Sequence, residues 1–144
     1  TGVLNPRANA NLGLPLPPIK SLLEKGANML LGTDNAMLNN SNMLAELDFT
    51  YKVAKSQYGD AVRPDPRDIL KLATVNMGKT LGGDRHGYLE EGLPADFVVL
   101  DFSKTRLRHT HHLVASIVTR LGAEDVLGTF LKGRILYKKP YRGI

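Results

Sequence analysis

The 144-residue sequence contains no cysteine. This absence excludes disulfide bonds and metal sites built from thiolates, and it favours a cytoplasmic location. Runs of about 18 or more consecutive apolar residues are also missing, so we expect no membrane-spanning helix. The first residues lack the basic start and the apolar stretch of a secretory signal, so we expect no leader peptide.

Acidic residues are fewer than basic ones, 14 against 19, and the formal net charge is +5. A nucleic-acid-binding domain would gather such charge into a patch. Lysine and arginine are instead spread along the chain and cluster only at residues 132–142, so we expect no nucleic-acid partner. Glycine-rich phosphate loops and nucleophile elbows are absent too. With 42% hydrophobic and 23% charged residues, the composition is that of a globular domain.

The first half of the chain has the pattern of parallel α/β structure. Residues 1–4 are typical of the end of a strand, and residues 28–32 form a second apolar strand. Between them, Pro17 and Pro18 suit the start of a helix and Gly26 suits its end. A strand–helix–strand order implies that the two strands run parallel. Their carboxyl ends should therefore meet at one edge of the sheet.

Two further helices and a β-rich segment follow. Residues 42–58 carry apolar side chains at helical spacing. A second helix begins with Asp65 as its N-cap and has an apolar face from Ile69 to Met77, and Gly82-Gly83 closes this half of the chain. Residues 97–102 then read as a strand, and two more strands are joined at Lys132-Gly133 as a hairpin. We therefore predict an α/β part at residues 1–83 and a mainly β part at residues 84–144.

Asp34 is the strongest candidate for a functional residue. It follows the second strand directly, and ligands of α/β sheets and barrels bind beyond the carboxyl ends of the strands. Asn9 and Asn35 should open onto the same edge and could present amides to one ligand. The alternative is structural: asparagine and aspartate favour turns and helix starts, whatever their chemistry.

Other polar clusters are weaker candidates. His109 and His111 have the spacing of a metal chelate on a strand, but they lie in a polar segment without nearby carboxylates, which favours a surface loop. Glu90 and Glu91 are adjacent and would point in opposite directions, so they make a poor acid–base pair. His86 stands alone and is expected to be structural.

Four stretches together resemble the metal-dependent amidohydrolase superfamily, in its branch of chlorohydrolases and aminohydrolases that act on aromatic nitrogen heterocycles. They are "NPRANANLGLPLPPIKSLLEKG", "LLGTDNAMLNNSNMLAELDF", "DPRDILKLATVNMGKTLG" and "GYLEEGLPADFVVLD". The resemblance implies the C-terminal part of a (β/α)₈ TIM-like barrel. The chain would supply the last two strands and their helices, followed by a small, mainly β segment of a composite sandwich.

The resemblance also implies a chemistry. In the whole enzyme one divalent metal, zinc or iron, would bind Asp34 together with histidines that this chain lacks. Asp34 would also be catalytic, taking a proton from metal-activated water that attacks a ring carbon. The reaction would break a carbon–nitrogen bond other than a peptide bond, by deamination, or would release chloride. Asn9 and Asn35 would contact the small heterocyclic substrate.

A barrel of this kind needs about 250 residues, so the chain reads as a fragment of a larger enzyme. One metal ligand and two strands cannot make an active site, and we expect the fragment alone to be inactive. Its open strand edge should be covered by the missing N-terminal part of the barrel or by self-association. The alternative hypothesis is a non-catalytic α/β binding module that keeps the asparagine-rich edge.

Overall fold

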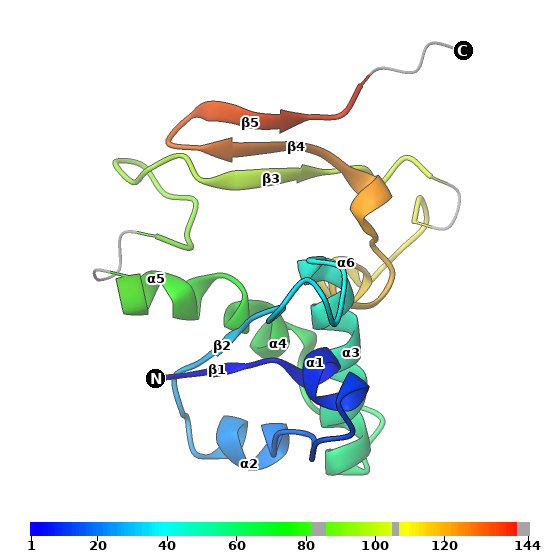
Figure 1. The fold of residues 1–144 in the computed structure, drawn as a ribbon. Coiled ribbons are helices and arrows are strands. Elements are labelled where there is room, and N and C mark those ends of the chain that lie inside the picture. The colour runs from blue at the N-terminus through cyan, green and yellow to red at the C-terminus, as the bar shows by residue number, and fades with distance from the viewer. Residues whose placement is uncertain (82–85, 105–106, 141–144) are drawn as a thin grey trace.

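The computed structural model describes residues 1–81, 86–104 and 107–140. Two sheets organise these residues, and the helices gather around the smaller sheet (Figure 1). The sequence predicted mixed α/β structure, and this is confirmed. The predicted boundary between residues 83 and 84 and the Gly82-Gly83 stop lie outside the described residues. Within the described ranges, no helix has both the length and the apolar character that a membrane crossing requires.

The smaller sheet consists of β1 (Gly2–Leu4) and β2 (Met29–Leu31). The two strands are parallel, as the sequence predicted, and Leu4 pairs with Leu31 at their carboxyl ends. Two helices connect them, α1 (Pro6–Asn11) and α2 (Ile19–Glu24). Helix α2 was expected, and Gly26 follows its end in a left-handed conformation with φ of 62°.

Helix α1 was not predicted, because the sequence indicated a single helix, near Pro17 and Pro18, between the two strands. Pro6 occupies the first helical position, where its fixed φ suits a helix start and its missing N–H costs nothing. The helix is only 6 residues long, so it shows no repeating apolar pattern. Its two asparagines, Asn9 and Asn11, bond to the carbonyls of neighbouring loop segments, as described below.

Helix α3 (Met43–Tyr58) follows β2 after a loop at residues 32–42. The side-chain oxygen of Asn42 accepts hydrogen bonds from the backbone N–H groups of Leu44 (3.1 Å) and Ala45 (3.3 Å), which fixes the start of the helix. The observed bounds agree with the predicted helix at residues 42–58. Apolar side chains of α3 and its neighbours then bury a common core, whose fully or nearly buried members are Leu4, Ile19, Leu31, Leu47, Val53, Ala54, Ile69, Leu72 and Val118.

The next helix was predicted as continuous, and this is wrong. The chain forms α4 (Pro66–Leu72) and then α5 (Val75–Leu81). The Thr74 hydroxyl donates to the Leu70 carbonyl (3.0 Å), and the Met77 N–H starts a new turn by donating to the Thr74 carbonyl (3.1 Å). A β-branched residue whose hydroxyl competes for backbone carbonyls weakens a helix at that point.

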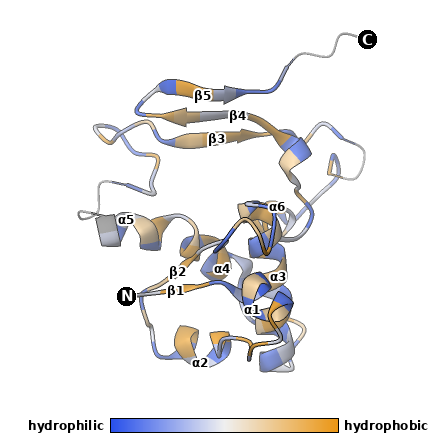
Figure 2. Ribbon diagram, in the orientation of Figure 1, coloured by the Kyte–Doolittle hydropathy of each residue, from blue (hydrophilic) through white to orange (hydrophobic). Residues whose placement is uncertain are grey.

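The larger sheet is antiparallel and contains β3 (Phe97–Leu100), β4 (Val126–Leu131) and β5 (Arg134–Lys138). The hairpin at Lys132-Gly133 is confirmed, and both of its turn residues have positive φ, 49° and 74°. Strand β3 ends two residues earlier than predicted, where the register shifts between Val99 and Leu100. Figure 2 shows that β3 and β4 are largely apolar ribbons.

Residues 107–125 add structure that the sequence did not reveal. Helix α6 (Leu113–Thr119) packs back against α3 and α4, and its Val118 joins the core. A 3₁₀ turn, η1 (Ala123–Asp125), then leads into β4. Helix α6 was not predicted, because the histidines at 109, 111 and 112 place polar residues directly before it and interrupt the apolar pattern of a helix start.

Candidate active site

The carboxyl ends of β1 and β2 are tied together by backbone and amide contacts. The Gly32 N–H donates to the Leu4 carbonyl (2.9 Å). When its amide nitrogen faces these carbonyls, Asn5 donates to the oxygens of Gly32 (3.0 Å) and Leu4 (3.1 Å). The loops after the two strands therefore leave the sheet at the same edge, as parallel strands require.

Asp34 lies at this edge, three positions after the last residue of β2, as the sequence predicted. Its backbone is left-handed, with φ of 55°. Its Oδ1 accepts a hydrogen bond from the Asn35 N–H (2.8 Å), and its side chain is exposed. Residues other than glycine adopt positive φ rarely, and such strained residues cluster at functional sites. Aspartate reaches this conformation more easily than most residues because its short side chain bonds locally.

The two asparagines proposed as ligand contacts make local hydrogen bonds. The Asn35 side-chain oxygen accepts from the Met37 N–H (2.8 Å), which forms a turn within the loop. The Asn9 side-chain nitrogen donates to the Pro15 carbonyl (3.0 Å) and holds the end of α1 against the following segment. Both residues thus have the turn-forming role that the sequence offered as the alternative. Their contact with a substrate stays a prediction.

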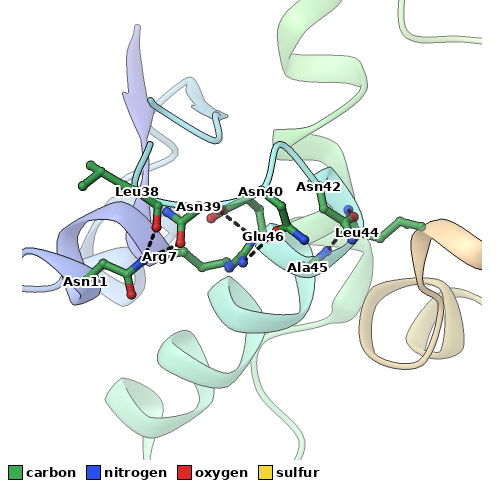
Figure 3. Close-up of polar contacts among 9 residues, drawn as sticks. All are labelled: Arg7, Asn11, Leu38, Asn39, Asn40, Asn42, Leu44, Ala45 and Glu46. Atoms are coloured by element: carbon green, nitrogen blue, oxygen red, sulfur yellow. Dashed lines mark hydrogen bonds and ion pairs between the residues drawn. The ribbon is translucent and has the colours of Figure 1, made fainter. Parts of the chain in front are cut away.

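A set of contacts that the sequence did not predict joins α1 to the loop at residues 32–42 (Figure 3). The Asn11 side-chain nitrogen donates to the Leu38 carbonyl (2.6 Å), and the side-chain amide of Asn39 lies beside it; when that amide is turned, its oxygen accepts from the Ala8 N–H (3.2 Å). Arg7 donates to the side-chain oxygen of Asn40 (3.1 Å). Two asparagines of this loop, Asn39 and Asn40, therefore hold it against α1.

Glu46 is the second feature that sequence analysis missed. Its side chain is fully buried on α3, and its Oε1 lies 3.4 Å from Nη1 of Arg7. Burial raises the pKa of Glu46 above the ordinary glutamate value, and the positive charge of Arg7 opposes that rise. No local signal marked it: Glu46 lies four residues before Thr50 on the same side of α3, and the structure shows that both side chains are buried.

The other candidates have surroundings of their own. His109 and His111 are exposed and, with Ser116 and Arg120 near α6, line a surface pocket. Nδ1 of His86 is 3.2 Å from Oδ2 of Asp96, so this histidine has a structural partner. Glu90 and Glu91 are exposed, as expected.

The donor set at the edge fits one position of a metal shell. Asp34 offers an exposed carboxylate, a ligand that zinc and iron both accept. Among the described residues, however, no three histidine, cysteine, aspartate or glutamate side chains come together as a metal-binding group. Catalytic zinc sites use about three protein ligands. Any metal at Asp34 would therefore take its other ligands from outside the described residues.

The sequence is similar to a known family and to named enzymes. Residues 2–136 match the amidohydrolase family. The chain is 34% identical over 135 residues to the 5'-deoxyadenosine deaminase of Methanopyrus kandleri, a match that covers 93% of this chain and 31% of that protein. It is 35% identical over 136 residues to a 5-methylthioadenosine/S-adenosylhomocysteine deaminase of Thermoanaerobacter pseudethanolicus, covering 93% of this chain and 32% of that protein.

The fold is shared as well. The crystal structure of an adenosine deaminase from Xanthomonas campestris with bound zinc aligns with a TM-score of 0.86 at 30% identity, over 92% of this chain and 31% of that chain. The chain thus spans about one third of the length of the relatives it matches.

Proposed function

The chain belongs to the amidohydrolase family, and from this premise we propose that the whole protein is a metal-dependent hydrolase that deaminates an aromatic nitrogen heterocycle. The resemblance read from the four stretches is confirmed by the family match and by relatives of the heterocycle deaminase branch. Deamination is favoured over dechlorination because the two sequence relatives described above are named as deaminases. Their names support an aminated purine nucleoside as the substrate class.

One observation carries the proposal: Asp34 is held at a positive φ of 55° immediately beyond a parallel strand, with its carboxylate exposed at the edge where barrel enzymes bind their ligands. A loop that only needed to turn could place glycine there without strain. An aspartate in this conformation supports a role for the carboxylate itself. The proposal follows from this position together with the family.

In the proposed mechanism Asp34 acts twice. It supplies one oxygen ligand to the divalent metal, zinc or iron, whose contribution when bound is to activate a water molecule at neutral pH. With the metal bound, the Asp34 carboxylate would accept a proton from the attacking water and would pass it to the amine that departs from the ring carbon. Carboxylates are weak bases at neutral pH, so the effectiveness of Asp34 depends on its being fixed within reach of the proton. Asn9 and Asn35 are proposed to face the substrate.

The described residues also support the proposal that the chain works only with a partner structure. In our proposal β1 and β2 are the last two strands of a (β/α)₈ barrel, and residues 84–144 form part of a composite sandwich. Side chains on the larger sheet are exposed although apolar, among them Val98, Ile135 and Leu136. Large exposed apolar patches mark interfaces. We propose that the rest of the protein, or a second copy of the chain, covers them and that the chain alone is inactive.

The test is Asp34→Asn in the full-length protein. Zinc and iron content is measured by elemental analysis, and ammonia release is measured with a panel of aminated purines, pyrimidines and triazines. We expect bound metal to fall and turnover to drop by at least about 100-fold, the lower range for loss of a general base. Asp65→Asn, the same chemical change at a helix cap, serves as the control and should leave both unchanged. Unchanged metal content and turnover in Asp34→Asn would instead favour a non-catalytic binding module.

A further inference from the structure

Arg7 connects the two segments that leave the carboxyl edge of β1 and β2. It is the second residue of α1, which follows β1 directly, whereas its partners belong to the loop and helix that follow β2. Nη2 donates to the side-chain oxygen of Asn40 (3.1 Å), and Nη1 lies 3.4 Å from Oε1 of Glu46 (Figure 3). One guanidinium therefore holds a loop residue and a buried helix residue at the same time.

The loop at residues 32–42 depends on such external contacts. Its own backbone hydrogen bonds among the described residues are short-range, from the Leu38 N–H to the Asn35 carbonyl (3.0 Å) and from the Asn42 N–H to the Asn40 carbonyl (2.8 Å). The start of the loop is tied to β1 and its end is the N-cap of α3. Between these ends, the side-chain contacts from α1 are those of Arg7 and Asn11.

Glu46, the buried partner of Arg7, makes this arginine hard to replace. The Glu46 side chain is fully buried, and its Oε2 has no hydrogen-bond partner among the described residues. Arg7 is its ion-pair partner, with 22% of the arginine side chain exposed. A lysine would offer a single ammonium where arginine presents a planar fork with several donors, so it could reach one partner and lose the other.

We propose that Arg7 is a positioning residue for Asp34. By holding Asn40 and Glu46 on one guanidinium, it fixes the loop that carries Asp34 over the edge of the sheet and so sets where the carboxylate meets the metal. This inference rests on the proposed role of Asp34. The competing explanation is that Arg7 only stabilises the packing of α1 against α3.

Zinc affinity of the full-length protein separates these two explanations. It is measured by competition with a chromogenic chelator, alongside urea unfolding and hydrogen exchange of peptides covering residues 33–42. We expect Arg7→Met to weaken zinc binding by about 10–100-fold, the range for residues that orient a metal ligand, and to speed exchange in the loop. Arg7→Lys should fall between Arg7→Met and the wild type.

Two further variants keep the test decisive. Asn40 is exposed, so Asn40→Ala removes the loop contact with little risk to folding and should also weaken zinc binding. Lys104→Met is the matched control, because Lys104 pairs with the buried Asp125 far along the chain from the proposed site. It should lower stability and leave zinc affinity within about twofold, well below the effect expected of a positioning residue.

Each outcome decides a different claim. If Arg7→Met and Asn40→Ala leave zinc affinity unchanged while Asp34→Asn weakens it, Arg7 is structural only and the inference is overturned. If Asp34→Asn itself leaves zinc affinity unchanged, the proposed function fails first and the inference fails with it. If all three weaken zinc binding and Lys104→Met does not, the positioning role is supported.

Discussion

Replacing Gly32 with alanine is expected to loosen the junction between β1 and β2. A Cβ atom at this position would lie 2.6 Å from the amide end of Asn5 and 2.9 Å from Cγ1 of Val3. The contact with Asn5 is 0.8 Å shorter (3.4 − 2.6) than the 3.4 Å at which ordinary Cβ contacts begin. Asn5 cannot turn away without cost, because its amide bonds the Gly32 and Leu4 carbonyls.

The size of the effect follows from the cost of adding a methyl group to a packed site, about 1–3 kcal/mol. A cost of about 2 kcal/mol changes a local opening equilibrium by about 30-fold. The reporting group is the Gly32 N–H, which donates to the Leu4 carbonyl at 2.9 Å and exchanges with solvent only when this junction opens.

The assay is hydrogen exchange of the full-length protein, followed by mass spectrometry of peptides covering residues 29–35. Exchange should be about 30-fold faster in Gly32→Ala than in the wild type. Gly128→Ala is the control, since its Cβ would lie 3.2 Å from a ring carbon of Phe130, which needs a much smaller adjustment, and exchange in β4 should change less. Wild-type exchange rates in Gly32→Ala would refute the steric reasoning.

Two predictions concern the cap of α4 and the open sheet. The Arg67 N–H bonds the Asp65 carboxylate and lowers its pKa below 3.8, so this carboxylate stabilises the fold above its unfolded pKa and loses that effect as the pH falls through the folded pKa. Full-length wild type should therefore resist urea better than Asp65→Asn at pH about 6, and the difference in free energy of unfolding should narrow as the pH falls below the ordinary aspartate pKa of about 3.9. A difference that stays constant over this range would contradict this. The 144-residue chain produced alone should self-associate through its exposed apolar strands, whereas a single monomeric species in sedimentation velocity would argue against it.

The sequence predicted the long elements well because their signals are local. Asp65 capped the helix it was expected to cap, and the Lys132-Gly133 turn joined the expected hairpin. Helix α1 and helix α6 were missed because each is short and mixed with polar residues, so tertiary packing rather than periodicity decides their conformation. The helix break at Thr74 was not predicted for a different reason. The apolar pattern continues across it, and the hydrogen bond of the Thr74 side chain that accompanies the break leaves no trace in that pattern.

The position of the candidate site could be predicted from the sequence, but the contacts that hold its loop in place could not. Asp34 could be placed at the strand end from the order of the elements alone. The pairing of Arg7 with Glu46 joins residues 39 positions apart (46 − 7) on two different elements, and no local pattern reports such a contact. The sequence predicted ligand contacts for Asn9 and Asn35 only, and it gave no sign that Asn39 and Asn40 lie against α1.

The left-handed backbone at position 34 also narrows what can replace the aspartate. Glycine and asparagine share its tolerance of this conformation, whereas most other residues would pull the loop out of shape. An alanine scan at this position would therefore confuse backbone strain with the loss of an oxygen donor. A related protein without the proposed reaction should still carry glycine, asparagine or aspartate here, because the backbone conformation of the loop requires one of them.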